Sequence, residues 1–183
     1  MEIIKKFLNF KEIQPKMPTS VEFFSTYRNQ NFSLPNSIIY YIARNPKSSK
    51  SYQKWIKVCK YFFAKNPILI INSLRFGEKL PQKILSTKSN IKIWITGGFL
   101  VNPLLPNETF QKLFSSIFLK IYCKSEILRL CLFDISLTFD EFKFLSSSAE
   151  AINLNNVSIK YQNGKDVELE KIVEISSNAK KFE

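Results

Sequence analysis

The pattern of apolar and polar positions between residues 33 and 65 predicts two amphipathic helices. The first begins near Ser33, a residue type that caps helices, and Pro35 suits its first turn because its missing N–H would have no helical partner. Its apolar positions, spaced for one face of a helix, are Ile38, Ile39 and Ile42. The helix is predicted to end at Asn45, because a residue that precedes proline avoids the α region.

The second helix is predicted to run from a cap at Ser48 or Ser49 to about Lys65. Large apolar residues recur at helical spacing on one side, namely Tyr52, Trp55, Cys59, Phe62 and Phe63. Lysines occupy the other side as a basic face, namely Lys50, Lys54, Lys57 and Lys60. This separation indicates a helix with a buried side and a solvated side. After Asn66 and Pro67 end the helix, Ile68–Ile71 continues as a short buried segment.

Beyond residue 90 the pattern changes to that of strands and short helices. Residues 91–95 alternate like a strand that ends at Gly97-Gly98, and residues 107–118 are predicted to be helical. The segment Leu130–Ser136 is echoed 22 residues later by Ile152–Ser158. The aligned pairs are Leu130/Ile152, Leu132/Leu154, Asp134/Asn156, Ile135/Val157 and Ser136/Ser158.

Each copy of this echo is followed by a predicted helix. Thr138 and Glu141 have the spacing of a capping box, and the helix they open carries Phe142 and Leu145. The second helix, residues 166–176, has its apolar positions at Val167, Leu169, Ile172 and Val173, and residues 180–183 begin a third strand. A strand and a helix every ~20–29 residues are typical of a leucine-rich repeat, although an ordinary α/β layer gives the same pattern.

Charge is concentrated in the first part of the chain. The 183 residues include 27 Lys and Arg against 15 Asp and Glu, a net charge of +12, and residues 1–80 hold 14 of these basic residues against 4 acidic ones. Such a basic region attracts an acidic protein surface or nucleic acid. No sequence pattern of an RNA- or DNA-binding domain is present, so nucleic acid is the less favoured partner.

The candidate chemistry is sparse. The chain has no His, the commonest general base and metal ligand, and its 3 Cys are too scattered for a zinc site or a disulfide framework. Gly97-Gly98 lacks the residues of a phosphate loop. We therefore expect no catalytic residue, cofactor or metal. The chain also lacks a signal peptide and a membrane-spanning apolar run, which predicts an intracellular location, cytoplasmic or nuclear.

The helical region resembles a known family. Leu34-Pro35 followed by Ile38 and Ile42, and then Val58-Cys59-Lys60 with Phe62, resembles the F-box, and the whole is similar to the divergent nematode-type F-box proteins that continue into leucine-rich-repeat-like units. The expected architecture is α+β. Its expected parts are a leader over residues 1–32, an F-box-like helical module over 33–75, a connecting α/β segment over 76–124 and leucine-rich-repeat-like units over 125–183.

The resemblance implies a function without chemistry. The F-box would dock on the Skp adaptor of a cullin–RING ubiquitin ligase through Leu34, Pro35, Ile38, Ile42, Val58 and Cys59. The repeats would hold an unknown protein substrate, and the chain would contribute proximity to a separate enzyme. The alternatives are a basic protein- or nucleic-acid-binding module with no ubiquitin role, and a degenerate family copy that binds neither. The apolar residues Ile38, Ile42, Trp55, Cys59 and Phe62 can also be simply the core between the two helices. The lysines can likewise be simply a solvated helix face.

Overall fold

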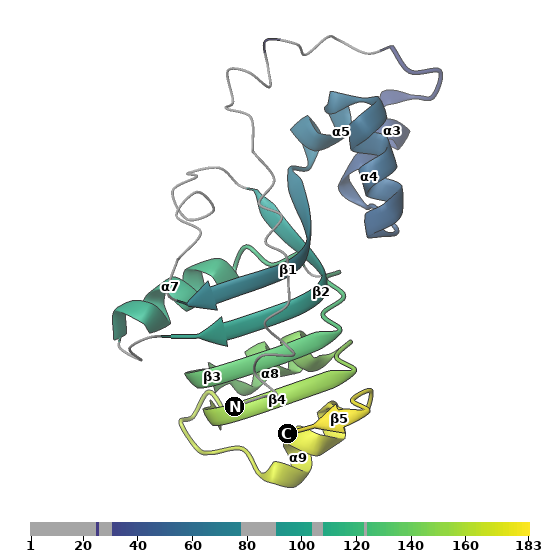
Figure 1. Ribbon diagram of the computed structural model, residues 1–183. Helices are drawn as coiled ribbons and strands as arrows, with labels where there is room; N and C mark the ends of the chain where they lie inside the picture. The colour runs from purple at the N-terminus through teal and green to yellow at the C-terminus, as the bar shows by residue number, and fades with distance from the viewer. Residues whose placement is uncertain (1–24, 26–30, 78–90, 104–107, 123) are drawn as a thin grey trace.

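The chain begins its described part with short helices and continues as alternating strands and helices (Figure 1). The computed structural model describes residues 25, 31–77, 91–103, 108–122 and 124–183, so most of the predicted leader lies outside it. The elements are α3 (Asn36–Arg44), α4 (Ser49–Val58), α5 (Lys60–Lys65), β1 (Ile68–Gly77), β2 (Lys92–Asn102), α7 (Glu108–Phe118), β3 (Arg129–Thr138), α8 (Phe139–Ser146), β4 (Ala151–Lys160), α9 (Leu169–Ile175) and β5 (Lys181–Phe182). The predicted mixture of helices and strands is confirmed.

The strands form one sheet in chain order, β1-β2-β3-β4-β5, and every neighbouring pair is parallel. Because side chains alternate along a strand, each strand sends every second residue toward the helices. In Figure 1, α7 and α8 lie behind the sheet. The core between them and the sheet includes Ile95, Phe99, Phe114, Leu130, Leu132, Phe142, Leu145 and Ile152. The helix predicted over residues 107–118 is therefore confirmed as α7, and its apolar side faces this core.

The predicted 22-residue echo is the pairing register of β3 and β4. Arg129 pairs with Ala151, Leu130 with Ile152, and Ile135 with Val157. Asp134 and Asn156 both have a positive φ, 49° and 52°, and the Asn156 amide donates a 2.8 Å hydrogen bond to the Asp134 carboxylate. Asp and Asn tolerate this left-handed conformation better than other non-glycine residues, which explains their presence in the echo. Because both strands have this left-handed residue at the same point, the alternation of their side chains reverses in both together and the register is kept.

Several predicted boundaries are wrong. Strand β2 does not end at Gly97-Gly98 but runs through them to Asn102. A Cβ on Gly97 would lie only 2.5 Å from Oδ1 and 2.7 Å from the carbonyl oxygen of Asn72, so glycine here allows β1 to approach. The segment Ile68–Ile71 is the start of the ten-residue strand β1, and the predicted module end at residue 75 falls inside that strand. On α9, Leu169 and Val173 are exposed rather than buried.

A second, smaller apolar cluster joins the helices to the sheet. It consists of Tyr52 of α4, Ile68 of β1, Trp94 of β2 and Tyr122, all buried. Polar contacts add to it, because the Asn66 amide donates to the carbonyls of Ala43 and Arg44 at 3.1 and 3.3 Å, at the end of α3. We call the four residues Tyr52, Ile68, Trp94 and Tyr122 the junction cluster. It fixes the position of α3, α4 and α5 near the start of β1.

The predicted capping box is present at α8 and gives a first testable prediction. The Glu141 N–H donates to Thr138 Oγ1 at 3.3 Å, and the Thr138 N–H donates to the Glu141 carboxylate at 2.8 Å. We expect Thr138→Ala to lower the free energy of unfolding by about 1 kcal/mol, because it leaves a helix N–H without its acceptor. Thr138→Ser keeps the hydroxyl and is the matched control in urea titrations. Equal losses in the two variants would contradict a capping role.

Candidate docking surface

Helix α3 is apolar on both of its sides. Ile39 and Ala43, four residues apart, are buried against the rest of the protein. Ile38 and Tyr41 on another side of the helix, and Leu34 just before the cap residue, are 46 %, 67 % and 47 % exposed. We call these three residues the α3 stripe. Apolar side chains that remain exposed together on one helix face commonly mark an interaction site.

The start of α3 differs from its prediction. Pro35 is the cap residue itself, and no side chain caps the helix, so the predicted capping role of Ser33 is wrong. The carbonyl of Pro35 accepts hydrogen bonds from the N–H groups of Ile38 and Ile39 at 3.0 and 3.1 Å. Pro35 is exposed beside the α3 stripe, whereas Ile42 is half-buried. Of the predicted docking residues on this helix, the structure brings Leu34, Pro35 and Ile38 to the surface together.

The predicted second helix is two helices, because the chain is extended at Cys59, with φ −145° and ψ 122°. Ser48 is confirmed as the cap of α4, since its hydroxyl oxygen accepts from the Ser51 N–H at 3.2 Å. At the break, Val58 is 87 % exposed and Cys59 is 8 % exposed. The Cys59 side chain thus belongs to the interior, whereas Val58 lies on the surface.

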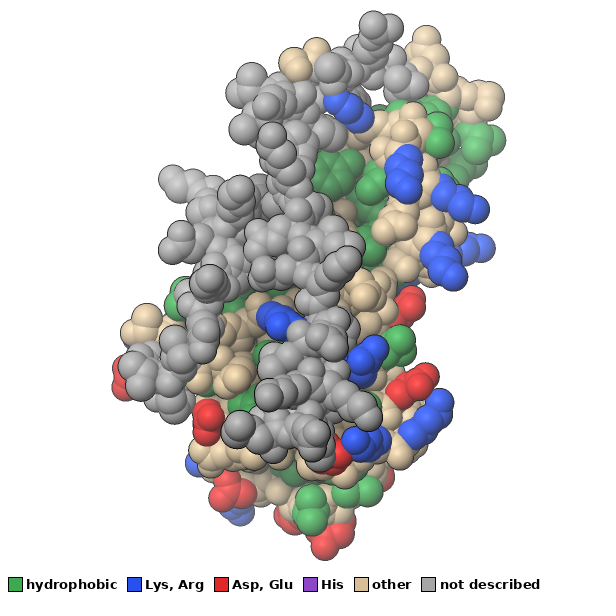
Figure 2. Space-filling model, viewed as in Figure 1, with side chains coloured by type: hydrophobic (Ala, Val, Ile, Leu, Met, Phe, Trp, Pro, Cys, Tyr) green, Lys and Arg blue, Asp and Glu red, His purple; other side chains and the backbone are tan. Residues whose placement is uncertain are grey.

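The same break divides the predicted basic face. Lys50, Lys54 and Lys57 lie on α4 at helical spacing and are exposed, whereas Lys60 opens α5 and is half-buried. Residues 31–67 contain seven Lys and Arg and no Asp or Glu. Four ion pairs join described residues in the C-terminal part of the chain, within residues 150–183. Figure 2 shows the Lys and Arg side chains gathered over the helices at the upper right, next to exposed hydrophobic side chains.

Three aromatic side chains near these lysines already pack or form hydrogen bonds within the protein. Tyr52 is fully buried, and its hydroxyl donates to the carbonyl of Asn66 and accepts from the Ile68 N–H at 3.3 Å. Trp55 and Phe62 pack together, with ring centroids 5.5 Å apart. Tyr52 is therefore unable to stack on a nucleic-acid base, which weakens the nucleic-acid alternative. Tyr41, the most exposed member of the α3 stripe, was missed by the sequence reasoning, although its spacing from Leu34 and Ile38 pointed to it.

The arrangement suits docking through apolar contact surrounded by positive charge. In the part of the chain that the structure describes, no group of three or more Cys, Asp or Glu side chains is placed to hold a metal ion. The helices of that part include none with the length and apolar character to cross a membrane. Comparisons of the chain with protein-family models, curated proteins and solved structures find no match.

Proposed function

We propose that the chain is a substrate-recognition adaptor of a Skp–cullin–RING ubiquitin ligase. In this proposal α3, α4 and α5 form an F-box-like module that docks on the Skp adaptor, and the sheet holds a protein substrate. The observation that carries it is the α3 stripe, together with Pro35, because these side chains remain exposed along α3 and at its start while Ile39 and Ala43 of the same helix are buried. The docking surface includes Val58 but excludes Cys59, which is buried.

The rest of the chain supports the second half of the proposal. Parallel strands that neighbour one another in chain order, with α7 and α8 on one face, are also the arrangement of leucine-rich repeats. The 22-residue register of β3 and β4 lies within the ~20–29-residue period of such repeats. We propose accordingly that residues 125–183 are leucine-rich-repeat-like units. A ligase adaptor of this kind works in the cytoplasm or the nucleus.

The test is capture of the full chain on immobilised Skp adaptor from the same source, at low and high salt. We expect the wild type to bind at both salt concentrations, because burial of apolar side chains does not depend on unscreened charge. Leu34→Asp/Ile38→Asp should weaken binding by about a hundredfold or more, since each buried side chain contributes about 1.5–3 kcal/mol.

A matched control is available on α9. Leu169 and Val173 are also exposed, apolar and four residues apart, so Leu169→Asp/Val173→Asp makes the same chemical change on another helix. This control should bind the adaptor like the wild type. Equal loss in both double variants, or no binding by a folded wild type, would contradict the proposal.

The second candidate function is a basic binding module with no ubiquitin role, which the seven Lys and Arg of residues 31–67, a segment without Asp or Glu, favour. Binding of that kind depends on charge and falls steeply with salt. Lys50→Glu/Lys54→Glu/Lys57→Glu separates the two candidates. It should abolish binding to an acidic partner or nucleic acid, and it should leave salt-resistant Skp capture in place.

A further inference from the structure

Helix α9 presents apolar side chains on its outward side. Leu169 and Val173 lie four residues apart on this helix and are 65 % and 53 % exposed. Ile172 and Ile175 of the same helix pack against the core, so the two exposed residues lie on another side of it. Apolar side chains that are exposed together on one helix face commonly mark a contact site. We call Leu169 and Val173 the α9 patch.

Acidic residues border the α9 patch. Glu170 and Glu174 each follow a patch residue by one position, and both are exposed. The Lys171 ammonium lies 2.7 Å from the Glu174 carboxylate on the same helix, but an exposed pair of this kind contributes little. Glu170 forms no ion pair with a residue that the structure describes. The α9 patch therefore suits a partner that offers apolar surface together with positive charge.

The outward face of α4 has this complementary chemistry. Lys50, Lys54 and Lys57 lie at helical spacing along it, and Val58, four residues after Lys54, is 87 % exposed beside them. Within the described part of the chain, none of these three lysines forms an ion pair. Lysine side chains cover apolar surface with their stems while their ammonium groups remain in water or reach a carboxylate. We call these four residues the α4 face.

The charges on the two helices have the same spacing. Residues four positions apart are separated by about 6 Å along the axis of an α-helix. Lys50 and Lys54 are spaced in this way on α4, and Glu170 and Glu174 on α9. When the two helices pack along one another, two lysines therefore meet two glutamates at once, which also sets the register of the contact. The α9 patch then lies against the lysine stems and Val58.

The two surfaces lie at opposite ends of the molecule. Figure 1 shows α4 at the upper end and α9 at the lower end, with the sheet between them. In Figure 2 the Lys and Arg side chains gather over the helices at the upper right, and most Asp and Glu side chains in view lie in the lower half. One chain therefore cannot bring its own two surfaces together, and a contact between them joins two copies. Because different surfaces meet, such a contact repeats from copy to copy.

We propose that the chain self-associates head to tail, with the α9 patch of one copy packed on the α4 face of the next. Glu170 and Glu174 pair with lysines across the contact, while Leu169 and Val173 pack on the lysine stems and Val58. Two helix faces of this length bury little area, so the contact is weak and reversible. Charge holds it together with apolar burial, so it weakens as the salt concentration rises. The inference goes beyond the proposed ligase function and does not depend on it.

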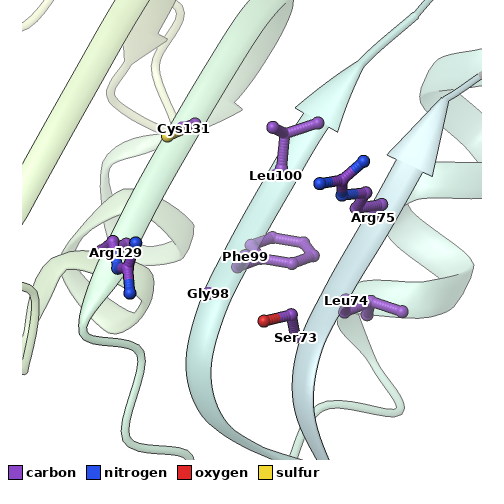
Figure 3. Close-up of a pocket in the computed structure, with 8 residues that line it drawn as sticks. All are labelled: Ser73, Leu74, Arg75, Gly98, Phe99, Leu100, Arg129 and Cys131. Carbon is purple, nitrogen blue, oxygen red and sulfur yellow. The ribbon is translucent and has the colours of Figure 1, made fainter. Parts of the chain in front are cut away.

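A small hollow over β1, β2 and β3 is not a second surface of this kind (Figure 3). Ser73 of β1, Gly98 of β2 and Arg129 of β3 lie there in one row across the strands. Gly98 and the Ser73 hydroxyl are buried, so the surface of another protein does not reach this row. The exposed helix faces at the two ends of the molecule are better placed for a contact between copies.

The test is sedimentation equilibrium of the full chain over a range of concentrations, at low and high salt. We expect the wild type to form larger species as its concentration rises, and fewer of them at high salt. Lys50→Glu/Lys54→Glu/Lys57→Glu and Glu170→Lys/Glu174→Lys should each weaken self-association by about tenfold or more, because attraction becomes repulsion at each charge pair. Mixing these two variants brings opposite charges together again at both kinds of contact. The mixture should therefore associate to within about threefold of the wild type.

A matched control separates local charge from net charge. Lys112→Glu/Lys143→Glu/Lys165→Glu makes the same charge change as the α4 variant at exposed positions elsewhere, and it should change self-association by less than about twofold. Three results would overturn the inference: a folded wild type that stays monomeric, equal weakening by the control and the α4 variant, and a mixture of the two charge-reversed variants that stays monomeric. Thermal unfolding checks that each variant is folded.

Skp capture keeps this inference and the proposed function apart. Leu34→Asp/Ile38→Asp should lose Skp capture and keep self-association, because the α3 stripe takes no part in the contact between copies. Glu170→Lys/Glu174→Lys should do the reverse. All of these variants keep Val58, the one residue that the two surfaces share, so failure of one proposal leaves the other measurable.

Discussion

Replacement of Trp94 by alanine is expected to lower the free energy of unfolding by about 3–5 kcal/mol. Trp94 is fully buried and is the largest side chain of the junction cluster. Its ring lies 4.9 Å from that of Tyr122, centroid to centroid, and it packs in one cluster with Tyr52 and Ile68. Alanine would leave a cavity at the point where the helices meet the sheet. Urea titration followed by circular dichroism measures the loss.

Trp94→Phe is the matched control, because it keeps an aromatic ring in the cluster. The indole N–H of Trp94 is buried and makes no hydrogen bond to a described residue, so its removal costs nothing and relieves an unsatisfied donor. We expect Trp94→Phe to lower the free energy of unfolding by less than about 2 kcal/mol. Equal losses for Trp94→Phe and Trp94→Ala would show that ring packing at the junction contributes little.

The alternating β segments of the second half were predictable because local pattern and tertiary pairing agree there. The echo between residues 130–136 and 152–158 places apolar residues at the same positions of two neighbouring strands, and the Asp134/Asn156 match marks a left-handed residue that both strands share. The capping box at Thr138 is similarly local, since its two partners are three residues apart. The capping box depends on residues three positions apart, and the echo depends on the pairing of two neighbouring strands.

The helix break at Cys59 was not predictable in the same way. The lysine and aromatic spacing continues through it, so the sequence favours one helix. In the structure α5 turns away from α4 and packs against both α3 and α4. Tertiary packing therefore overrides the local pattern. The same packing buries Cys59 and half-buries Lys60, two residues that the single-helix interpretation placed on a docking surface or a solvated face.

The candidate sites also differ in whether local sequence pattern or tertiary structure brings their residues together. The exposure of Leu34 and Ile38 was foreseen because both belong to one short local pattern at the start of α3, whose spacing also contained the signal for Tyr41. The small hollow between Ser73, Gly98 and Arg129 was not foreseen, because Ser73 and Arg129 are far apart in the sequence and come together only through the register of three strands. A site of this kind becomes visible only when the strand order is known.

The hydroxyl of Tyr52 connects the helices to the first strand, and its loss should be the most costly change of a single polar atom at the junction. It donates to the Asn66 carbonyl and accepts from the Ile68 N–H in a site with no solvent exposure. We expect Tyr52→Phe to lower the free energy of unfolding by about 1–3 kcal/mol at neutral pH, because two buried backbone groups lose their partner. Tyr41→Phe removes an exposed hydroxyl and should be nearly neutral.

The same hydroxyl should also make the protein sensitive to alkaline pH. Burial raises the pKa of Tyr52 to about 12, against the opposing effect of the Ile68 N–H, whereas an unfolded tyrosine has a pKa near ~10. Between these two values the unfolded chain binds fewer protons than the folded one, so the free energy of unfolding falls as pH rises, by about 2–3 kcal/mol in all. Denaturation of wild type, Tyr52→Phe and Tyr41→Phe across this range measures the effect. Tyr41→Phe should follow the wild type, and Tyr52→Phe should lack this part of the fall. Parallel curves for Tyr52→Phe and the wild type would show that Tyr52 does not carry the alkaline sensitivity.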